Sequence, residues 1–502
     1  MSTLVSLEEA LEHFDPVIGL EVHVELNTAT KMFSPAPNPA ASLEDYPPNT
    51  AISPVCLGLP GSLPVVNAEA VRSSIALGLA LGCEIRPTSR FARKNYFYPD
   101  LAKNYQISQY DEPIAHDGAI QVELDDQTLW DVEIERAHME EDAGKLTHVG
   151  GSTGRIQGAE YSLVDYNRAG VPLVEIVTRP IVGAREKAPQ LARAYVQTIR
   201  DIVLALGVSQ ARMERGNLRC DANVSLMPRG SDTFGTRSET KNVNSFRSIE
   251  RAVAYEIRRQ ATLLLAGESV TQETRHWHED TGETSAGRPK SDADDYRYFP
   301  EPDLLPVSPD PELIDEIRDS LPEAPVVRRR RLREAWQLAD TDFQALINAD
   351  LLDVVEATIA AGASASSAKK WWLGELSRIA NDREVLSTSL LSPAQVAELE
   401  DEVARGTIND KMAREVLVAM VDGEGSPAQI IEARGLAVVS DDSALRAAID
   451  DALAAQPDVL DKIRDGKVQA AGAIIGQVMK ALGGQADAQR VRELILEQAG
   501  VN

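Results

Sequence analysis

The segment VIGLEVHVEL, residues 17–26, alternates apolar and polar side chains with period two. This alternation predicts a strand whose polar face carries Glu21, His23 and Glu25. Carboxylates and an imidazole spaced two residues apart on one strand face can hold a metal ion. Half-buried strands also carry polar residues on a face that only meets water. The segment alone leaves both interpretations open.

Two further acidic stretches bear on that choice. Glu175 interrupts the apolar run from Val171 to Val177. A buried carboxylate is unfavourable without a cation or hydrogen-bond donors, so Glu175 either has such partners or faces water from an edge strand. The adjacent acids Glu140, Glu141 and Asp142 follow a predicted hairpin whose strands join at residues 125–128. They are either solvated or, together with Glu21, His23 and Glu175, part of a site for a hard ion such as magnesium.

A second set of polar groups suits phosphate and ribose recognition. In RGNLRCDANVSL, apolar residues alternate with Arg219, Asp221, Asn223 and Ser225, and Lys241 lies on the next predicted strand. Guanidinium, ammonium and amide groups on rigid strands bind phosphate well. The chain has no Walker loop, no G-x-G-x-x-G and no H-E-x-x-H, so any nucleotide would bind by another route.

The elements that position these groups change in character along the chain. Up to about residue 300 the sequence predicts strands and hairpins, with two amphipathic helices that end at Gly207 and Gly267 and pack on the sheet. Seven prolines between residues 300 and 325 predict a stretch without regular structure. Everything after it is helical in pattern. We therefore expect an α+β protein with a mainly antiparallel sheet domain at residues 1–305, an all-α domain at 306–400 and an all-α tail at 401–502.

Composition narrows the class of protein. The 502 residues predict two to four domains, and the net charge of −27 argues against a protein that coats nucleic acid, so contacts with RNA would be local. One candidate is the arginine run 328–331 with Arg333, which is either a solvated helix face or a phosphate site. No long apolar run or signal peptide is evident, and the three scattered cysteines fit a reducing compartment, so we expect a cytoplasmic location and no membrane.

Long motifs link the chain to a known family. They are VIGLEVHVEL, VCLGLPGSLPVVN, RKNYFYPDLAKNYQISQ, HMEEDAGK, VDYNRAGVPLVEIV, MERGNLRCDANVSL, ETKNVNSF and DYRYFPEPDL, followed near the C-terminus by GKVQAAGAIIGQVMK. In order and spacing they closely resemble the B subunits of tRNA-dependent amidotransferases, the GatB family. The resemblance covers nearly the whole chain.

The resemblance implies a cytoplasmic complex of three different chains. A glutaminase chain, GatA, releases ammonia from glutamine, and a small chain, GatC, stabilises the pair. GatB uses ATP and magnesium to phosphorylate the side-chain carboxylate of Glu-tRNA(Gln) or Asp-tRNA(Asn), and ammonia arriving through a channel then displaces the phosphate. The implied fold is a cradle of antiparallel sheet with helices, then a helical domain and a tail domain that grip the tRNA.

The resemblance also assigns roles to residues. His23, Glu141 and Glu175, with Glu21 beside them, would hold the catalytic magnesium. Lys94, opposite an acid of HMEED, would lie at the mouth of the ammonia channel. The nucleotide and acyl-acceptor pocket would comprise Arg219, Asp221, Asn223, Ser225 and Lys241.

The sequence departs from the family pattern at the cysteines and in GRPKSDADDYRYF, where members often show a methionine-arginine-x-lysine-glutamate segment, and it also carries an insertion. Many members bind zinc through paired cysteines, but here only Cys56 remains of those four, and one thiolate cannot build a tetrahedral site, so we expect no zinc. Residues 149–160 are an insertion whose Gly, Ser and Thr content predicts a loop.

Two other functions compete with the kinase and transamidase role. A tRNA-binding scaffold that lacks catalysis would not need Glu21, His23, Glu141 and Glu175 together, and a free-standing metal hydrolase would need a nucleophile that the sequence does not offer. The sequence does not decide between Glu-tRNA(Gln) and Asp-tRNA(Asn) as substrate.

Overall fold

The computed structural model describes residues 4–42, 46–150, 158–289, 296–437, 442–465, 467–482 and 486–500. The chain forms two compact units, Met1–Arg329 and Arg330–Asn502. Each unit is described by itself. The predicted loop at 149–160 lies partly outside the described residues, and its described ends adjoin the two-stranded sheet of β7 (Lys145–Val149) and β8 (Tyr161–Asp165).

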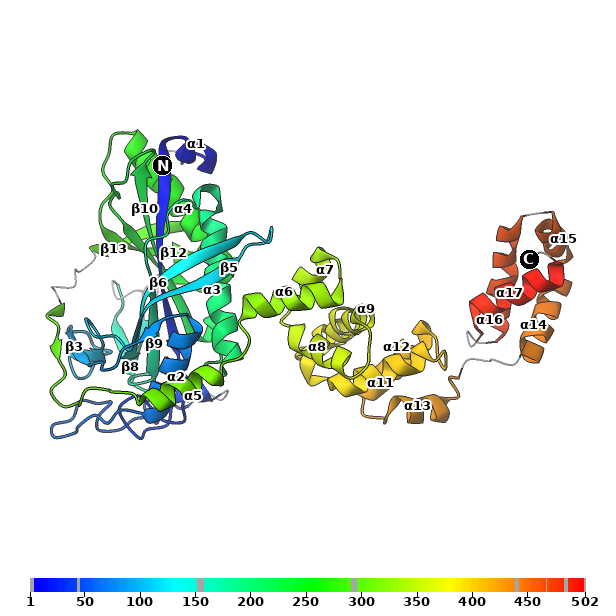
Figure 1. Cartoon of the computed structure of the whole chain (residues 1–502), viewed down its shortest axis with the longest axis horizontal. Coiled ribbons are helices and arrows are strands. Elements are labelled where there is room, and N and C mark those ends of the chain that lie inside the picture. The colour runs from blue at the N-terminus through cyan, green and yellow to red at the C-terminus, as the bar shows by residue number, and fades with distance from the viewer. Residues whose placement is uncertain are drawn as a thin grey trace. The chain divides into compact units, whose positions relative to one another are not determined.

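A nine-stranded sheet organises the described part of the first unit, and it is antiparallel apart from one pair of strands. Its order is β13-β12-β11-β10-β1-β9-β6-β5-β2. Figure 1 labels several of these strands, among them β10, β9 and β6. The strands are β1 (Phe14–Glu25), β2 (Glu84–Ile85), β5 (Ala115–Glu123), β6 (Leu129–Glu141), β9 (Pro172–Thr178), β10 (Leu218–Pro228), β11 (Ser238–Val243), β12 (Glu273–His278) and β13 (Glu283–Pro289). The predicted strand at 17–26 is therefore central, and the predicted hairpin is β5–β6.

Helices cover one face of this sheet. The two predicted amphipathic helices are α3 (Ala188–Ala205) and α4 (Phe246–Leu265), which pack on each other and on β1 and β10. α2 (Ala68–Ala80) covers β5 and β6, and α1 (Leu7–His13) packs on α4. Alternate β1 residues such as Ile18 and Val22 are fully buried in the core beneath the helices. This packing leaves the other face of β1, with Glu21 and His23, away from the helices.

The proline-rich segment is not free of regular structure, so that expectation was wrong. α5 (Pro311–Asp319) begins with a proline in its first turn, where the missing N–H is not needed. α6 (Pro325–Trp336) begins in the same way. A three-stranded sheet, in the order β14 (Phe299–Pro300), β3 (Ala92–Asn95), β4 (Tyr105–Ser108), also uses this segment.

The described part of the second unit is helical throughout. One apolar cluster, running from Leu332 to Ile431, joins the helices α7 (Asp340–Asn348), α8 (Leu352–Ala360), α9 (Ala365–Lys369), α10 (Ser377–Arg383), α11 (Pro393–Ala404), α12 (Asp410–Val421) and α13 (Pro427–Arg434). A separate cluster, from Leu445 to Ala499, joins α14 (Asp442–Ala455), α15 (Pro457–Arg464), α16 (Ala471–Ala481) and α17 (Ala488–Ala499). The predicted α+β class is confirmed. The domain limits at 305 and 400 stay predictions.

The arginine run on α6 makes ion pairs within each unit. Arg329 pairs with Asp201 of α3 in the first unit, and Arg331 pairs with Glu356 of α8 at 3.1 Å in the second. Arg331, with a side chain 49% exposed, agrees with a solvated helix face balanced by neighbouring acids, whereas the side chain of Arg329 is only 12% exposed. Among the described helices, none is long and apolar enough to cross a bilayer.

Candidate active site

The antiparallel register places one row of polar residues across four central strands. His23 on β1 lies opposite Arg219 on β10 and opposite Glu175 on β9. Glu175 in turn lies opposite His138 on β6. Neighbouring strands are about 4.8 Å apart, so opposite residues on one face are within reach of each other. The sheet therefore assembles residues more than 100 positions apart in sequence.

The centre of this row is a buried cluster of histidines and carboxylates. The Glu175 Oε2 atom lies 3.4 Å from His23 Nε2 and 3.5 Å from His138 Nε2. The Glu140 Oε2 atom lies 3.6 Å from His138 Nε2, and Lys94 Nζ lies 3.7 Å from Glu140 Oε1. Glu175 is 8% exposed on a central strand, which excludes the edge position that the sequence had left open.

The side chains in this cluster shift one another's pKa values. Burial favours neutral forms, but the Glu175 carboxylate outweighs burial and raises the pKa of both His23 and His138. Against the same burial, the two histidines hold the pKa of Glu175 well below its ordinary value. Lys94, followed by His138, likewise lowers the pKa of Glu140 despite its burial. The carboxylates of Glu140 and Glu175 are thus ionised at neutral pH, beside Lys94 and the two histidines.

Glu141 lies outside this cluster. Its carboxylate accepts hydrogen bonds from Lys103 Nζ and, at 3.0 Å, from the backbone N–H of Ile107 on β4. The acid of HMEED that faces Lys94 and the histidines is Glu140. Glu140 is accompanied by His138, which the sequence analysis had missed. The assignment of Glu141 to the magnesium site stays a prediction.

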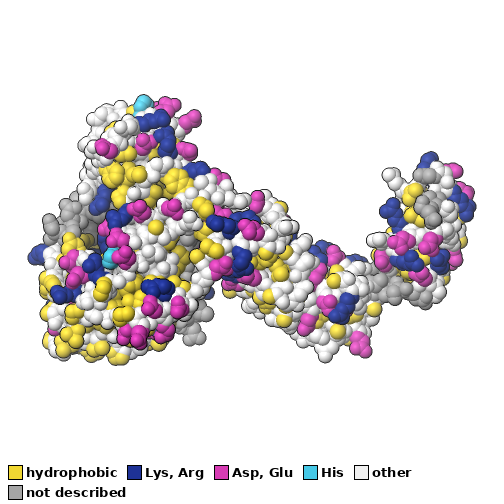
Figure 2. Space-filling model, in the orientation of Figure 1, with side chains coloured by type: hydrophobic (Ala, Val, Ile, Leu, Met, Phe, Trp, Pro, Cys, Tyr) yellow, Lys and Arg dark blue, Asp and Glu magenta, His cyan; other side chains and the backbone are white. Residues whose placement is uncertain are grey.

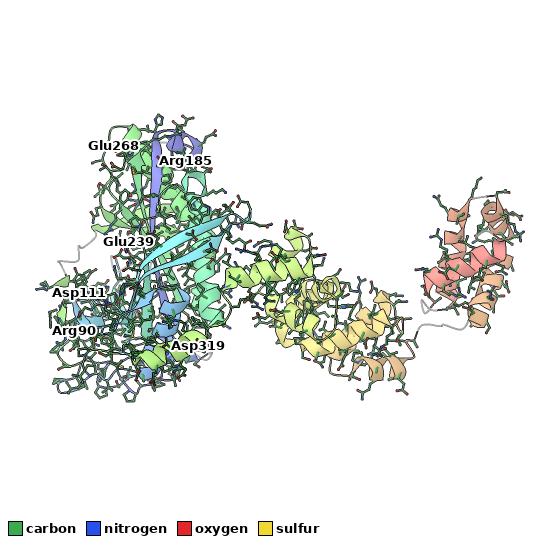
Figure 3. The ribbon with its side chains drawn as sticks, viewed as in Figure 1. Arg90, Asp111, Arg185, Glu239, Glu268 and Asp319 are labelled. Atoms are coloured by element: carbon green, nitrogen blue, oxygen red, sulfur yellow. The ribbon has the colours of Figure 1, made fainter. Side chains whose placement is uncertain are left out.

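A second group of carboxylates lies next to the first on the same face. Carboxylate oxygens of Glu21, Asp221 and Glu239 come within 4.8 Å of one another. Lys241 donates a hydrogen bond to Asp221, and its Nζ lies 3.6 Å from Glu239 Oε1. Burial would lower the pKa of Lys241, but these acids raise it, so the ammonium stays charged. Glu239 lies near the middle of the first unit (Figure 3).

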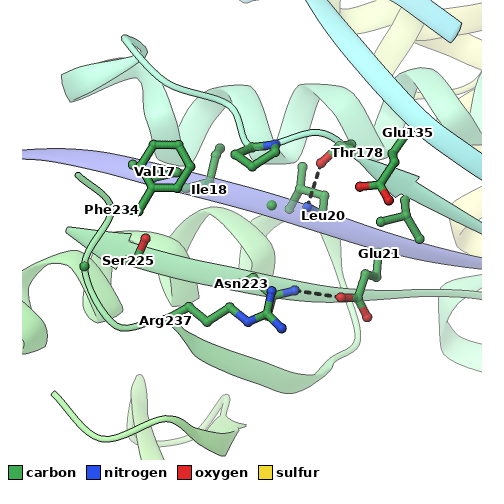
Figure 4. A pocket seen from close by; sticks show the side chains of 14 residues that line it. Val17, Ile18, Leu20, Glu21, Glu135, Thr178, Asn223, Ser225, Phe234 and Arg237 are labelled. Atoms are coloured by element: carbon green, nitrogen blue, oxygen red, sulfur yellow. Dashed lines mark hydrogen bonds between the residues drawn. The ribbon is translucent and has the colours of Figure 1, made fainter. Parts of the chain in front are cut away.

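The predicted nucleotide residues line two neighbouring hollows. Arg219, Asp221 and Lys241 line a cavity of about 350 Å³ together with His23 and Glu140. Asn223 and Ser225 line a separate pocket of about 210 Å³, which Glu21, Phe234 and Arg237 also line. Figure 4 shows this pocket and the 2.9 Å hydrogen bond from Asn223 Nδ2 to Glu21 Oε1. Glu21 therefore stands between the carboxylate group and the pocket.

A buried acid pair, also missed by the sequence analysis, supports Arg219. Asp142 accepts from Arg219 NH2 at 2.5 Å, and against burial Arg219 and Arg168 hold the pKa of Asp142 low. Burial and the adjacent Asp142 carboxylate raise the pKa of Glu25 to about 8. Glu25 is 5% exposed and accepts a 2.8 Å hydrogen bond from Asn217 Nδ2. At neutral pH Glu25 is therefore the protonated member of the pair.

Replacing Glu25 with glutamine should flatten the pH dependence of stability. The folded state holds a proton on Glu25 up to a pH of about 8, whereas the ordinary pKa is 4.5, so the wild type loses stability as pH rises between these values. We expect the wild type to lose roughly 2 kcal/mol more than Glu25→Gln between pH 5 and pH 7 in urea unfolding. Glu84→Gln, at an exposed position of β2, is the control. Parallel pH slopes for wild type and Glu25→Gln would contradict the assignment.

Cys56, which remains of the cysteine pattern, lies in a polar buried setting. Its Sγ atom is 3.5 Å from Lys31 Nζ and 3.3 Å from Ser53 Oγ. Lys31 is 1% exposed and also donates to the carbonyl of Ala169 at 2.7 Å. A lysine thus ties this loop to the turn that precedes β9.

An open sheet that buries two histidines among ionised carboxylates beside two hollows, followed by a helical unit, defines a multidomain enzyme chain. Comparison with known proteins makes this specific: the family model for the GatB/GatE catalytic domain matches residues 16–315, and the model for the GatB domain matches residues 353–498. The chain belongs to the GatB/GatE family of amidotransferase subunits.

Similar proteins match along their whole length. The chain is 67% identical to the B subunit of the aspartyl/glutamyl-tRNA(Asn/Gln) amidotransferase of Clavibacter michiganensis, over 99% of this chain and 98% of that protein. It is 66% identical to the protein of the same name from Leifsonia xyli and 59% identical to that of Streptomyces coelicolor, each over 99% of this chain.

Proposed function

We propose that this chain activates the side-chain carboxylate of Glu-tRNA(Gln), Asp-tRNA(Asn) or both, using ATP and magnesium, and amidates it with ammonia. The glutaminase chain GatA would supply the ammonia, and the small chain GatC would complete the complex in the cytoplasm. The γ-phosphoryl group passes from ATP to the carboxylate, which leaves ADP and an acyl phosphate. Ammonia then attacks the acyl carbon, phosphate leaves, and the amide results.

The observation that supports this proposal is the set of carboxylate and imidazole ligand atoms that the sheet brings together. His138, Glu140 and Glu175 offer ligand atoms within 4.8 Å of one another, and the His138 Nε2 atom faces both carboxylates. Glu21, Asp221 and Glu239 form the all-carboxylate group that a hard divalent ion prefers. These residues fit magnesium, with His23 adjoining the first group. When bound, magnesium neutralises phosphoryl oxygens so that two anions can meet.

The chain's own cations have defined tasks in this scheme. Lys241 and Arg219 line the cavity and present positive charge to the phosphates and the acyl group. Asn223 and Ser225 line the pocket shown in Figure 4, which suits the remainder of the nucleotide. Lys94 keeps Glu140 ionised. The resemblance assigns Lys94 to the mouth of the ammonia channel.

The test is ATP cleavage by the complete complex. We expect magnesium-dependent cleavage that is stimulated by Glu-tRNA(Gln) or Asp-tRNA(Asn) and not by the uncharged tRNAs, with amide formed when glutamine is present. A non-catalytic tRNA-binding scaffold predicts no such stimulation, and a free-standing hydrolase predicts cleavage that is indifferent to charging.

A further inference from the structure

A row of four tyrosines runs beside the candidate active site. The rings of Tyr110 and Tyr298 are stacked, with centroids 4.3 Å apart and planes 8° apart. Tyr298 meets Tyr296 at 6.1 Å, and Tyr296 meets Tyr96 edge to face at 6.3 Å. The four rings come from three separate segments around the three-stranded sheet β14-β3-β4. We call them the tyrosine row.

The inner end of the row opens on the catalytic groups. Tyr96 lines the cavity of about 350 Å³ that also contains His23, Glu140 and Arg219. Lys94 Nζ lies 5.3 Å from the centre of the Tyr296 ring and 3.7 Å from Glu140 Oε1. A ligand that follows the row inward therefore reaches the carboxylate and histidine cluster.

The outer end of the row is open to solvent. Tyr110 is 48% exposed although its ring stacks on Tyr298. It precedes Asp111, which Figure 3 marks near Arg90 at the side of the first unit where β3 lies. Arg297, between two tyrosines of the row, is exposed and has a left-handed backbone with φ of 45°. Asn95 donates a 2.8 Å hydrogen bond to its carbonyl, which holds this conformation in place.

We infer that the tyrosine row binds the unpaired 3′-terminal nucleotides of the aminoacylated RNA, with a base stacked on the Tyr110–Tyr298 pair. This inference rests on the proposed function. The amino acid is esterified to the ribose of the last nucleotide, so its base must lie one sugar outside the cavity in which the side chain reacts. Aromatic faces stack bases regardless of sequence, which suits an end shared by different tRNAs.

The charge distribution favours stacking over phosphate neutralisation. The chain carries a net charge of −27. Figure 2 shows basic and acidic side chains intermingled on the visible face of the first unit, without a broad basic patch. A single-stranded end that is held by rings needs few cations, whereas a long RNA contact through phosphates needs many.

The experiment uses the complete heterotrimer and an uncharged tRNA whose terminal adenine is replaced by 2-aminopurine, a base whose fluorescence falls on stacking. We expect quenching with the wild-type chain and with Tyr110→Trp. Tyr110→Ala and Tyr298→Leu should lose most of the quenching and bind this tRNA about tenfold more weakly. Tyr161→Ala is the matched control, because Tyr161 is a 55% exposed tyrosine on β8, outside the row.

A shortened tRNA separates this contact from a general loss of binding. With a tRNA lacking its last three nucleotides, Tyr110→Ala and the wild type should bind equally. Equal weakening with full-length and shortened tRNA, or full quenching by Tyr110→Ala, would overturn the inference. The binding experiment contains neither ATP nor an amino acid, so its outcome does not depend on catalysis. Failure of the wild-type complex to form amide in a separate assay would refute the proposed function but would leave the measured tRNA binding unchanged.

Discussion

Glu175→Gln is expected to abolish amide formation on Glu-tRNA(Gln) and Asp-tRNA(Asn) by the assembled complex, lowering the rate about 10³-fold. Glu175 is the shared acceptor between His23 and His138, at 3.4 and 3.5 Å. An amide has no charge to offer a divalent ion, and the two histidines lose the neighbour that raises their pKa. The variant thus disables the cluster while preserving side-chain volume.

The measurement compares amide formation, magnesium-dependent ATP cleavage and glutaminase activity in one preparation. Glutaminase activity and complex assembly should remain, because Glu175 belongs to the sheet of this chain. Glu133→Gln provides the control: Glu133 lies on β6 with its side chain 69% exposed, so its loss should leave all three activities unchanged. Normal amide formation by Glu175→Gln would show that the cluster is structural and would require a site built from Glu21, Asp221 and Glu239 alone.

Much of the fold follows from periodicity in the sequence. The alternation at 17–26 predicted β1, and the two helices that end before Gly207 and Gly267 appear as α3 and α4. These signals are strong because one face of each element is buried. The proline-rich stretch misled the prediction because proline interrupts a helix interior but fits its first turn, as Pro311 does in α5.

The sequence could not predict which of Glu140 and Glu141 faces the histidines, because β6 contains a bulge. Alternation counted from the buried Val132 and Ile134 would put Glu141 on the polar face. The register shift between Ile134 and Arg136 reverses that phase, so Ala137 and Met139 face the core and Glu140 turns toward His138. One unpaired residue thus changes which acid faces His138.

His138 could have been found from its pattern. His138 and Glu140 stand two residues apart, as Glu21 and His23 do on β1. The pair Glu25 and Asp142 left no such signal, because their contact depends on the approach of the ends of β1 and β6, which lie on either side of β9. Strand order is set by the tertiary fold, so contacts of this kind cannot be predicted from a single sequence.

Lys241→Met is expected to raise the KM for ATP about 100-fold and to strengthen magnesium binding in the absence of nucleotide. Lys241 contributes the ammonium that contacts Asp221 and Glu239, and it lines the cavity proposed for the phosphates. Removing a charge-assisted phosphate contact costs on the order of 2–3 kcal/mol, which corresponds to roughly that change in KM. The same substitution removes the Lys241 ammonium from beside Glu21, Asp221 and Glu239, so these three carboxylates would bind a divalent ion more tightly.

The stronger magnesium binding expected for Lys241→Met can be measured without an activity assay. In thermal unfolding without ATP, added magnesium should raise the melting temperature of Lys241→Met more than that of the wild type, because the ion binds the folded state where the ammonium no longer competes. Lys187→Met is the matched control, since Lys187 forms an exposed pair with Asp126 at 2.8 Å on the β5–β6 hairpin. An equal magnesium shift in all three proteins, together with an unchanged KM for ATP, would remove Lys241 and its three acids from the nucleotide site. A large magnesium shift with an unchanged KM for ATP would instead show that Lys241 affects the metal site but does not contact the nucleotide. Arg219 would then be the residue that contacts the phosphates.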